Sequence, residues 1–180
     1  MFSYSITKNH IKKFPKILTK CEIYDIIDVV INMENEIIGF TGKHFFLSNF
    51  YERDVTYEGV TYKNNEAAFQ AQKLINEKEK QRFSNLSPSE AKKLGRSIEL
   101  RKDWETIKSS AMYYICMAKF SQNEDLKKRL IETADLHLEE TNWWHDNCWG
   151  NCTCNKCKDI QGENRLGRIL MLIRDELKGK

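Results

Sequence analysis

The chain of 180 residues has few of the features that would place it outside the ordinary globular proteins. It contains only two prolines, Pro15 and Pro88, and therefore no proline-rich linker. No apolar run approaches the roughly 20 residues that span a bilayer, and the N-terminus lacks the continuous apolar core of a signal peptide. We therefore expect a cytoplasmic protein without a membrane partner, whose cysteines meet a reducing environment and form no disulfides.

Strong charge of one sign is also missing. Lys and Arg number 29 and Asp and Glu 26, and the net charge of +3 is too small to indicate a nucleic-acid coat protein. We find no repeat of the period typical of solenoids or propellers. The apolar content of 41% and the aromatic content of 11% are those of a globular protein. A chain of this length predicts one domain with a full core.

The pattern of apolar residues predicts an α+β domain that is mostly helical. β-branched residues within 23–38, and a hairpin over 55–62 that turns at Gly59, favour a small sheet in the N-terminal half. A Ser-Pro-Ser-Glu sequence at 87–90 is typical of a helix start. Helices are predicted over 66–78, 80–83, 87–96, 103–120, 124–132 and 166–177, with a further short strand within 133–140.

One predicted helix carries a polar stripe. Glu66, Gln70 and Lys73 share one face at i, i+4 and i+7 spacing, and Asn65 is a candidate cap. Glu66 would then lie near the positive end of the helix dipole. The alternative is an ordinary solvated helix face, which most Glu residues occupy. The apolar and aromatic segments on either side favour a functional interpretation.

A long loop over 141–164 supplies a second acid, Asp146. Loops of this length in a domain tend to be functional. Two carboxylates and a flat aromatic such as Trp104 form a recurring arrangement for cleaving glycosidic bonds, in which one acid protonates the leaving group and the other stabilises the sugar cation. Spacing alone does not show that Glu66, Trp104 and Asp146 meet in space, and each also suits a core or surface role.

Several short segments, taken in order, resemble those of the NADAR, or YbiA-like, family. The resemblance implies a YbiA-like fold for residues 39–180, preceded by an extension over 1–38 with a lysine-rich arm and a strand. The segments lie at 46–50 (FLSNF), 66–73 (EAAFQAQK), 91–96 (AKKLGR), 100–105 (LRKDWE), Met112 with 119–120, 138–140 (LEE), 149–150 (WG) and 164–171 (NRLGRILM).

The resemblance implies an N-glycosidase that hydrolyses a ribosyl C1–N bond, with Glu66, Asp146 and Trp104 at the catalytic positions and no cofactor required. One implied substrate is guanine in nucleic acid that carries ADP-ribose. The five lysines within residues 1–20 favour this substrate because they attract phosphates. The alternatives are ribosylamino-pyrimidine phosphates of riboflavin synthesis, and a module that binds ADP-ribose or NAD without hydrolysis.

Further residues are candidates for substrate binding. Some of them have a structural alternative: a turn is an equal alternative for Asn49, whereas the core for Phe50 and a helix cap for Asn164 are favoured over ligand contact. Arg96 and Arg101 lie just before Trp104 and suit a phosphate. The complete set is Asn49, Phe50, Gln70, Lys73, Arg96, Arg101, Lys119, Trp149, Gly150 and Asn164.

Two positions depart from the family pattern. Many members have His after the catalytic Glu, where this chain has Ala67, and many have a glycine-rich stretch where this chain has cysteines at 152–157. Thiolates at this density can hold a structural zinc, although only one pair has CxxC spacing. The predicted ligands are Cys152, Cys154 and Cys157, with Cys148 or His145 as the fourth; the alternative is a set of reduced surface thiols.

Overall fold

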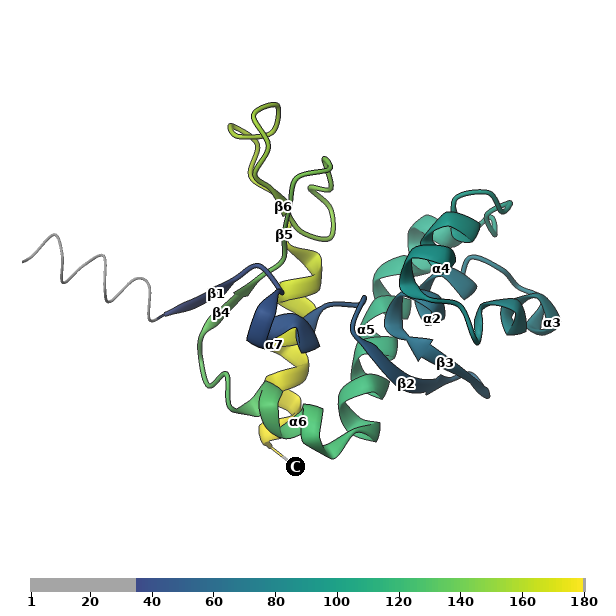
Figure 1. Cartoon of the computed structure of the whole chain (residues 1–180), viewed down its shortest axis with the longest axis horizontal. Coiled ribbons are helices and arrows are strands. Elements are labelled where there is room, and N and C mark those ends of the chain that lie inside the picture. The colour runs from purple at the N-terminus through teal and green to yellow at the C-terminus, as the bar shows by residue number, and fades with distance from the viewer. Residues whose placement is uncertain (1–34, 180) are drawn as a thin grey trace, which may run out of the picture. The chain divides into compact units, whose positions relative to one another are not determined.

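The computed structural model describes residues 35–179. Its first element, β1 (Glu36–Ile38), pairs in parallel with β4 (His137–Glu139), a strand far along the sequence (Figure 1). Ile37 lies opposite Leu138, and both side chains are buried. β4 confirms the short strand predicted within 133–140. The lysine-rich arm and most of the strand predicted within 23–38 lie outside the described residues.

The predicted hairpin is confirmed. β2 (Glu52–Tyr57) and β3 (Val60–Asn64) pair in antiparallel fashion. The two residues between them, Glu58 and Gly59, have φ values of 48° and 77°. Positive φ at both positions is typical of the tight turns whose twist matches that of the strands.

The helix predicted over 66–78 is shorter than the sequence pattern indicated. α2 (Asn65–Ala71) ends after two turns, and α3 (Glu77–Lys80) with η2 (Gln81–Phe83) follows as a separate unit. The reason is Asn76, whose side chain accepts from two backbone N–H groups of the next turn, at 2.9 and 3.4 Å. A capped new start competes with continuation of the preceding helix.

The predicted helix start at 87–90 is confirmed. α4 (Pro88–Gly95) begins with a capping box in which Ser87 and Glu90 bond each other's backbone N–H groups. At its end α4 packs closely on α2. A Cβ atom on Gly95 would lie 1.9 Å from Oε1 of Gln70, so only glycine permits this approach.

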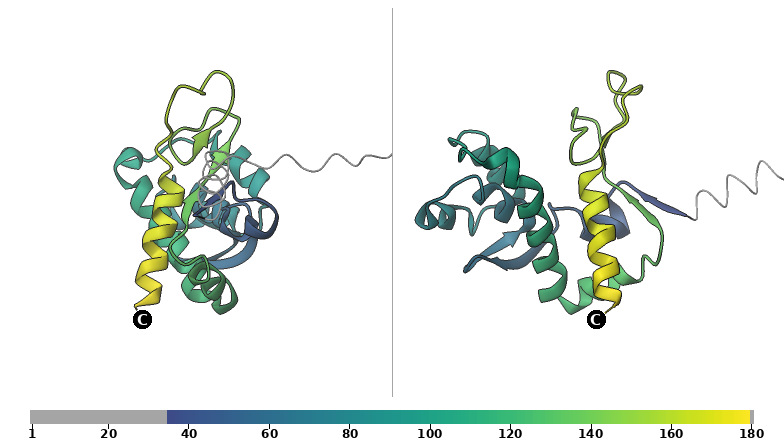
Figure 2. Two further views of the ribbon diagram at one scale, coloured as in Figure 1. Left: turned by 90° about the vertical axis from the view of Figure 1, so that its left-hand side faces the viewer. Right: turned by 180° about the vertical axis from the view of Figure 1, so that it is seen from behind.

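Three further helices complete the helical part. α5 (Trp104–Gln122) is followed directly by α6 (Glu124–Ile131), and α7 (Arg165–Lys178) packs beside α5 (Figures 1 and 2). These helices agree with the predicted ones to within a few residues. Their shared core contains Ile115, Phe120, Leu126, Leu130, Leu170 and Ile173, all fully buried.

The predicted loop 141–164 contains a short pair of strands. β5 (Thr141–Asn142) and β6 (Asn151–Cys152) run parallel, and the chain around them projects beyond the end of α7 (Figure 1). Near the other end of the described chain, η1 (Gly42–Leu47) is a 3-10 helix whose Phe46 and Leu47 enter the core.

The architecture confirms the α+β class and its mostly helical character. The small sheet predicted from the N-terminal half is instead three separate two-stranded pairs within residues 35–179. Two of them, β1 with β4 and β5 with β6, use strands from the second half of the chain, which local patterns do not reveal. Within the same residues, no helix has the length and apolar content that crossing a bilayer requires.

Candidate active site

One cavity of about 1050 Å³ has all three predicted catalytic residues in its wall. Glu66 enters from α2, Trp104 from the first turn of α5, and Asp146 from the loop after β5. Residues that lie far apart in the sequence therefore share one concave surface. A smaller cavity of about 620 Å³ around Arg53 and Glu90 has no aromatic residue in its wall. We take the larger cavity as the candidate active site.

The start of α2 sets the position of Glu66. Asn64 is the capping residue, since its Oδ1 accepts from the backbone N–H of Ala67 at 2.8 Å. The prediction that Asn65 caps the helix is wrong, because Asn65 is already its first residue. Glu66 consequently lies in the first turn, with 7% of its surface exposed.

The surroundings of Glu66 favour its neutral form. Burial raises the pKa of Glu66, although Lys92, the Gln70 side chain, Lys73 and Arg96 act in the opposite direction. The hydrogen bond from Gln70 Nε2 to Glu66 Oε1 measures 2.8 Å. A carboxyl group with a raised pKa beside a cavity holds its proton more strongly than one in water does, which suits it to protonating a leaving group.

Three aromatic side chains form one wall of the cavity. Phe69 lies between the two tryptophans, with ring centroids 5.1 Å from Trp104 and 5.2 Å from Trp149. Lys73 Nζ lies 5.9 Å from the centre of the Trp104 ring and donates to the backbone oxygen of Gly95 at 2.8 Å. The wall offers flat apolar surface for a base or a sugar face.

Several cationic side chains also line the cavity. Lys92 Nζ lies 5.3 Å from the ring centres of both Phe50 and Trp144, so the ammonium group sits between two aromatic faces. Lys93 and Arg96, both exposed, also line the cavity. Cations in the wall of a cavity that also contains acids suit a substrate with phosphate groups.

The Asp146 carboxylate is oriented by the backbone of its own loop. Oδ1 accepts from the N–H groups of Cys148 at 3.0 Å and Trp149 at 2.9 Å. The Asn142 side chain holds the Asp146 backbone, donating to its carbonyl at 2.6 Å and accepting from its N–H at 3.1 Å. Asn142 lines the cavity and was not among the sequence candidates.

The loop after η1 forms a further part of the wall, and Lys119 holds it in place. Lys119 is fully buried, and its Nζ donates to the backbone oxygen of Ser48 at 2.9 Å. Burial lowers the pKa of Lys119 to about 7. Lys119 does not line the cavity; its Nζ supports the backbone of Ser48, which does.

Comparison with known proteins identifies the family. Residues 39–178 match the NADAR domain family. This chain belongs to it. An N-glycosidase YbiA of Shigella flexneri serotype 5b is 36% identical over 151 residues, which cover 81% of this chain and 91% of that protein. The NMR structure of YbiA from E. coli has a TM-score of 0.70 at 33% identity and covers 81% of this chain and 86% of that one.

A longer relative has a name that refers to riboflavin biosynthesis. A riboflavin biosynthesis protein of Vibrio vulnificus is 34% identical over 138 residues, which are 75% of this chain but 36% of that protein. The predicted resemblance and the YbiA-like fold are both confirmed. N-glycosidase is the activity that the comparisons support for this NADAR domain.

Glu140 lines the cavity of this NADAR domain but was not among the site residues predicted from the sequence. It lines the cavity directly after β4, and its Oε2 is buried without a hydrogen-bond partner. Burial first, and then the charge of Asp146, raises the pKa of Glu140 to about 7. The strand pattern could have predicted this placement, because residues two positions apart share one face of a strand and Leu138 is buried.

Three further substrate candidates do not line the cavity of the NADAR domain. Arg101 is not part of the cavity wall, and its side chain forms two hydrogen bonds with Asp103, at 2.6 and 3.0 Å. Asn164 occupies the N-cap position of α7, but its side chain does not cap the helix. It bonds the chain around β4 instead, at 2.8 and 3.1 Å. Gly150 is buried, and a Cβ there would lie 2.5 Å from the Glu140 carbonyl oxygen.

The four cysteines of the loop over 141–164 separate into two groups. Cys152, Cys154 and Cys157 converge with His145, whereas Cys148 contributes to the cavity wall and is not part of the cluster. Of the two fourth ligands considered from the sequence, the structure therefore brings His145, and not Cys148, to the other three.

Proposed function

We propose that this NADAR domain hydrolyses the ribosyl C1–N bond of a phosphorylated, nucleotide-like substrate. The observation that supports the proposal is the shared cavity, in whose wall the carboxyl groups of Glu66 and Asp146 occur together with Trp104 and several cationic side chains. Glycosidic cleavage needs an acid for the leaving group and a negative charge for the sugar cation, and this wall offers both.

Glu66 is the residue we assign as the general acid. Its proton passes to the leaving nitrogen as the C1–N bond breaks, and the bonding electron pair departs with that nitrogen. Burial keeps a larger fraction of Glu66 protonated than in water, because its pKa is raised. Asp146, oriented by the two N–H groups that bond its Oδ1, faces the positive charge that develops on the ribose. Water then adds at C1 and gives up one proton to the Glu66 carboxylate, which restores the acid.

Trp104 and the cations hold the substrate in our proposal. The Trp104 ring stacks on the base or the sugar, supported from behind by Phe69. Lys92, Lys93 and Arg96 bind phosphate oxygens. Ala67, where many family members have His, is fully buried and does not line the cavity, so this departure leaves the proposed mechanism intact.

For the substrate we propose guanine modified with ADP-ribose. A cavity of about 1050 Å³ is at the upper limit of the ~300–1,000 Å³ usual for small-molecule sites, and this favours a substrate with two phosphates over a single nucleotide. A second candidate is a ribosylamino-pyrimidine phosphate, which the name of the Vibrio relative favours.

Product analysis separates these possibilities. The full chain is incubated with an oligonucleotide that carries ADP-ribosylated guanine and, separately, with a ribosylamino-pyrimidine phosphate. Free ADP-ribose released only from the first substrate supports our proposal. Ribose 5-phosphate released only from the second would identify the riboflavin intermediate as the substrate instead. Binding of ADP-ribose without product from either substrate would contradict hydrolysis and support a binding module.

A further inference from the structure

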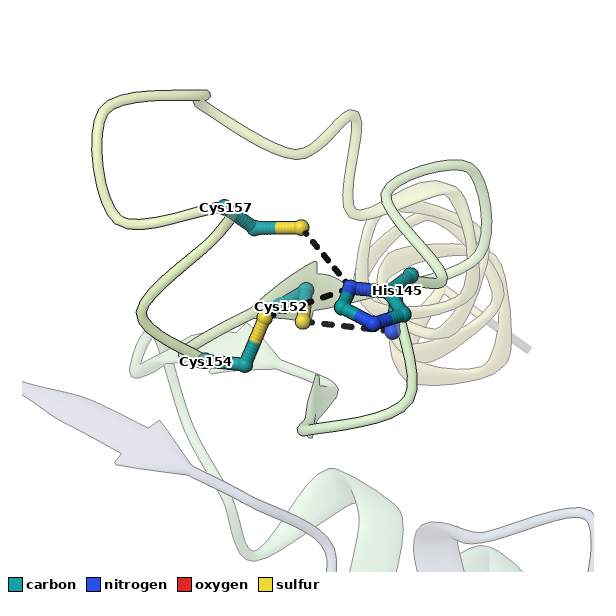
Figure 3. Close-up of side chains that lie close together, drawn as sticks. All are labelled: His145, Cys152, Cys154 and Cys157. Atoms are coloured by element: carbon teal, nitrogen blue, oxygen red, sulfur yellow. Dashed lines mark hydrogen bonds between the residues drawn. The ribbon is translucent and has the colours of Figure 1, made fainter.

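The loop that carries Asp146 also contains a cluster of four metal-binding side chains. The ligand atoms of His145, Cys152, Cys154 and Cys157 all lie within 4.8 Å of one another. Figure 3 shows the three sulfur atoms turned toward the His145 ring. The cluster has four donors, three soft sulfurs and one imidazole nitrogen, which is a ligand set of structural zinc sites.

The distances within the cluster match a tetrahedral site. His145 Nδ1 lies 3.2 Å from the Cys154 sulfur and 3.4 Å from the Cys157 sulfur. In a tetrahedron with Zn–S bonds of about 2.3 Å and a Zn–N bond of about 2.0 Å, nitrogen and sulfur are separated by about 3.5 Å. Small side-chain movements therefore suffice to accept the ion.

The backbone already holds the ligands in this arrangement. The N–H of Cys157 donates to the carbonyl of Cys154 at 2.9 Å, which closes the CxxC segment into a turn with both thiols on one side. The backbone N–H of His145 lies 3.3 Å from the Cys152 sulfur. Hydrogen bonds from outer groups to the ligands are typical of metal sites, where they orient the donors.

The loop buries little apolar surface. Among residues 151–163 only Cys152 and Cys157 are buried, with 3% and 6% of their surfaces exposed. Ile160 is 54% exposed and contributes little to a core. A segment without apolar side chains to bury needs another source of stability, and a metal ion supplies it in small structures.

We propose that His145, Cys152, Cys154 and Cys157 bind one zinc ion. Four protein ligands close the coordination sphere, so the site is structural and takes no part in the chemistry. His145 directly precedes Asp146, and Cys152 pairs with Asn142, whose side chain holds the Asp146 backbone. The ion therefore fixes the loop side of the cavity. Zinc binding itself does not depend on the substrate proposed above.

Metal analysis of the purified full chain tests the site. We expect one zinc per chain, and a cobalt-substituted form with the absorption bands of tetrahedral sulfur ligation. Cys154→Ser, Cys157→Ser and His145→Ala should lower the zinc content to about a tenth or less, because three ligands bind zinc far more weakly than four. Cys148→Ser and His137→Ala are the matched controls, which lie outside the cluster and should retain the ion.

A second measurement guards against variants that simply misfold. In the unaltered protein, removal of zinc by a chelator should increase amide hydrogen exchange in residues 145–160 while the exchange of α5 and α7 stays slow. Zinc content that remains far below one per chain after reconstitution would overturn the proposal. So would a disulfide between two of the cluster cysteines in freshly purified protein, or loss of zinc in Cys148→Ser with retention in His145→Ala.

Discussion

Gln70 lies one turn beyond Glu66 on α2 and donates a hydrogen bond from its Nε2 to Glu66 Oε1 at 2.8 Å. Both side chains line the cavity, yet only 6% and 7% of their surfaces are exposed. A carboxyl group in such a position loses its hydration, and the hydrogen bond offsets part of that cost. The i, i+4 spacing on the helix therefore places a hydrogen-bond donor, itself buried, beside the Glu66 carboxyl group.

Replacement of Glu66 by Gln should lower kcat by about 10²–10⁴-fold, because the variant has no carboxylic proton to transfer to the leaving nitrogen. The glutamine still offers an oxygen to Gln70, so the fold and the substrate affinity should change little. In the unaltered enzyme kcat should fall as pH rises through the raised pKa of Glu66, and the variant should lack this dependence. Steady-state kinetics against pH measures both.

The matched control for this experiment is Glu99→Gln, an exposed residue outside the cavity wall, which should keep the full rate. A wild-type rate in Glu66→Gln would remove Glu66 from the mechanism.

Glu140 should make stability depend on pH. Its pKa in the folded protein is raised from 4.5 to about 7, so the folded state binds this proton more tightly than the unfolded chain does. The resulting stability is fully present below pH 4.5 and is lost as pH rises through about 7. Between pH 4.5 and pH 8 the free energy of unfolding should fall by up to about 3 kcal/mol relative to Glu140→Gln.

Urea unfolding of both proteins across this pH range measures the difference. Glu132→Gln is the comparison variant, since its carboxyl is exposed and should cause a much smaller change. Parallel stability curves for the unaltered chain and Glu140→Gln would show that Glu140 is not desolvated.

Gly95→Ala should displace Gln70 in the cavity wall, although Gly95 itself does not line the cavity. The added Cβ would meet Gln70 Oε1 at 1.9 Å, so Gln70 has to move away from Glu66. We expect a loss of about 1–3 kcal/mol in stability, as for other overpacked sites, together with a lower kcat. Gly179→Ala is the control, because the nearest atoms to its Cβ lie 3.9 Å away. Equal stability and activity for the two variants would exclude the close approach of α4 to α2.

Lys92→Met should weaken substrate binding more than it slows the chemical step. The methionine keeps the apolar contacts with Phe50 and Trp144 but removes the charge that we assign to a phosphate. A charged hydrogen bond contributes about 1.5–3 kcal/mol, so KM should rise roughly 10–100-fold with a smaller change in kcat. Lys128→Met on α6, exposed and outside the cavity, should leave KM unchanged. A similar KM for both variants would place the phosphate elsewhere.

Local signals predicted most helix starts and the β2–β3 hairpin. The capping box at Ser87 and the turn at Gly59 depend on residues within one turn of each other, and both occur as expected. The end of α2 was misjudged because the cap at Asn76 competes with helix continuation, and apolar periodicity does not reveal that competition. Strand pairing such as β1 with β4 joins distant segments, so no local pattern could reveal it.

The sequence by itself determined which chemical groups are available and which local elements carry them. The sequence predicted that Glu66 lies in a first helical turn, Trp104 at a helix start and Asp146 in a long loop, since each of these placements depends only on near neighbours. Only the tertiary structure decided which groups share the cavity. Lys119 supports the backbone of Ser48, Arg101 bonds Asp103 outside the cavity wall, and Glu140 lines the cavity. Burial and distance result from the packing of distant elements, which sets the pKa values and the contacts on which function depends.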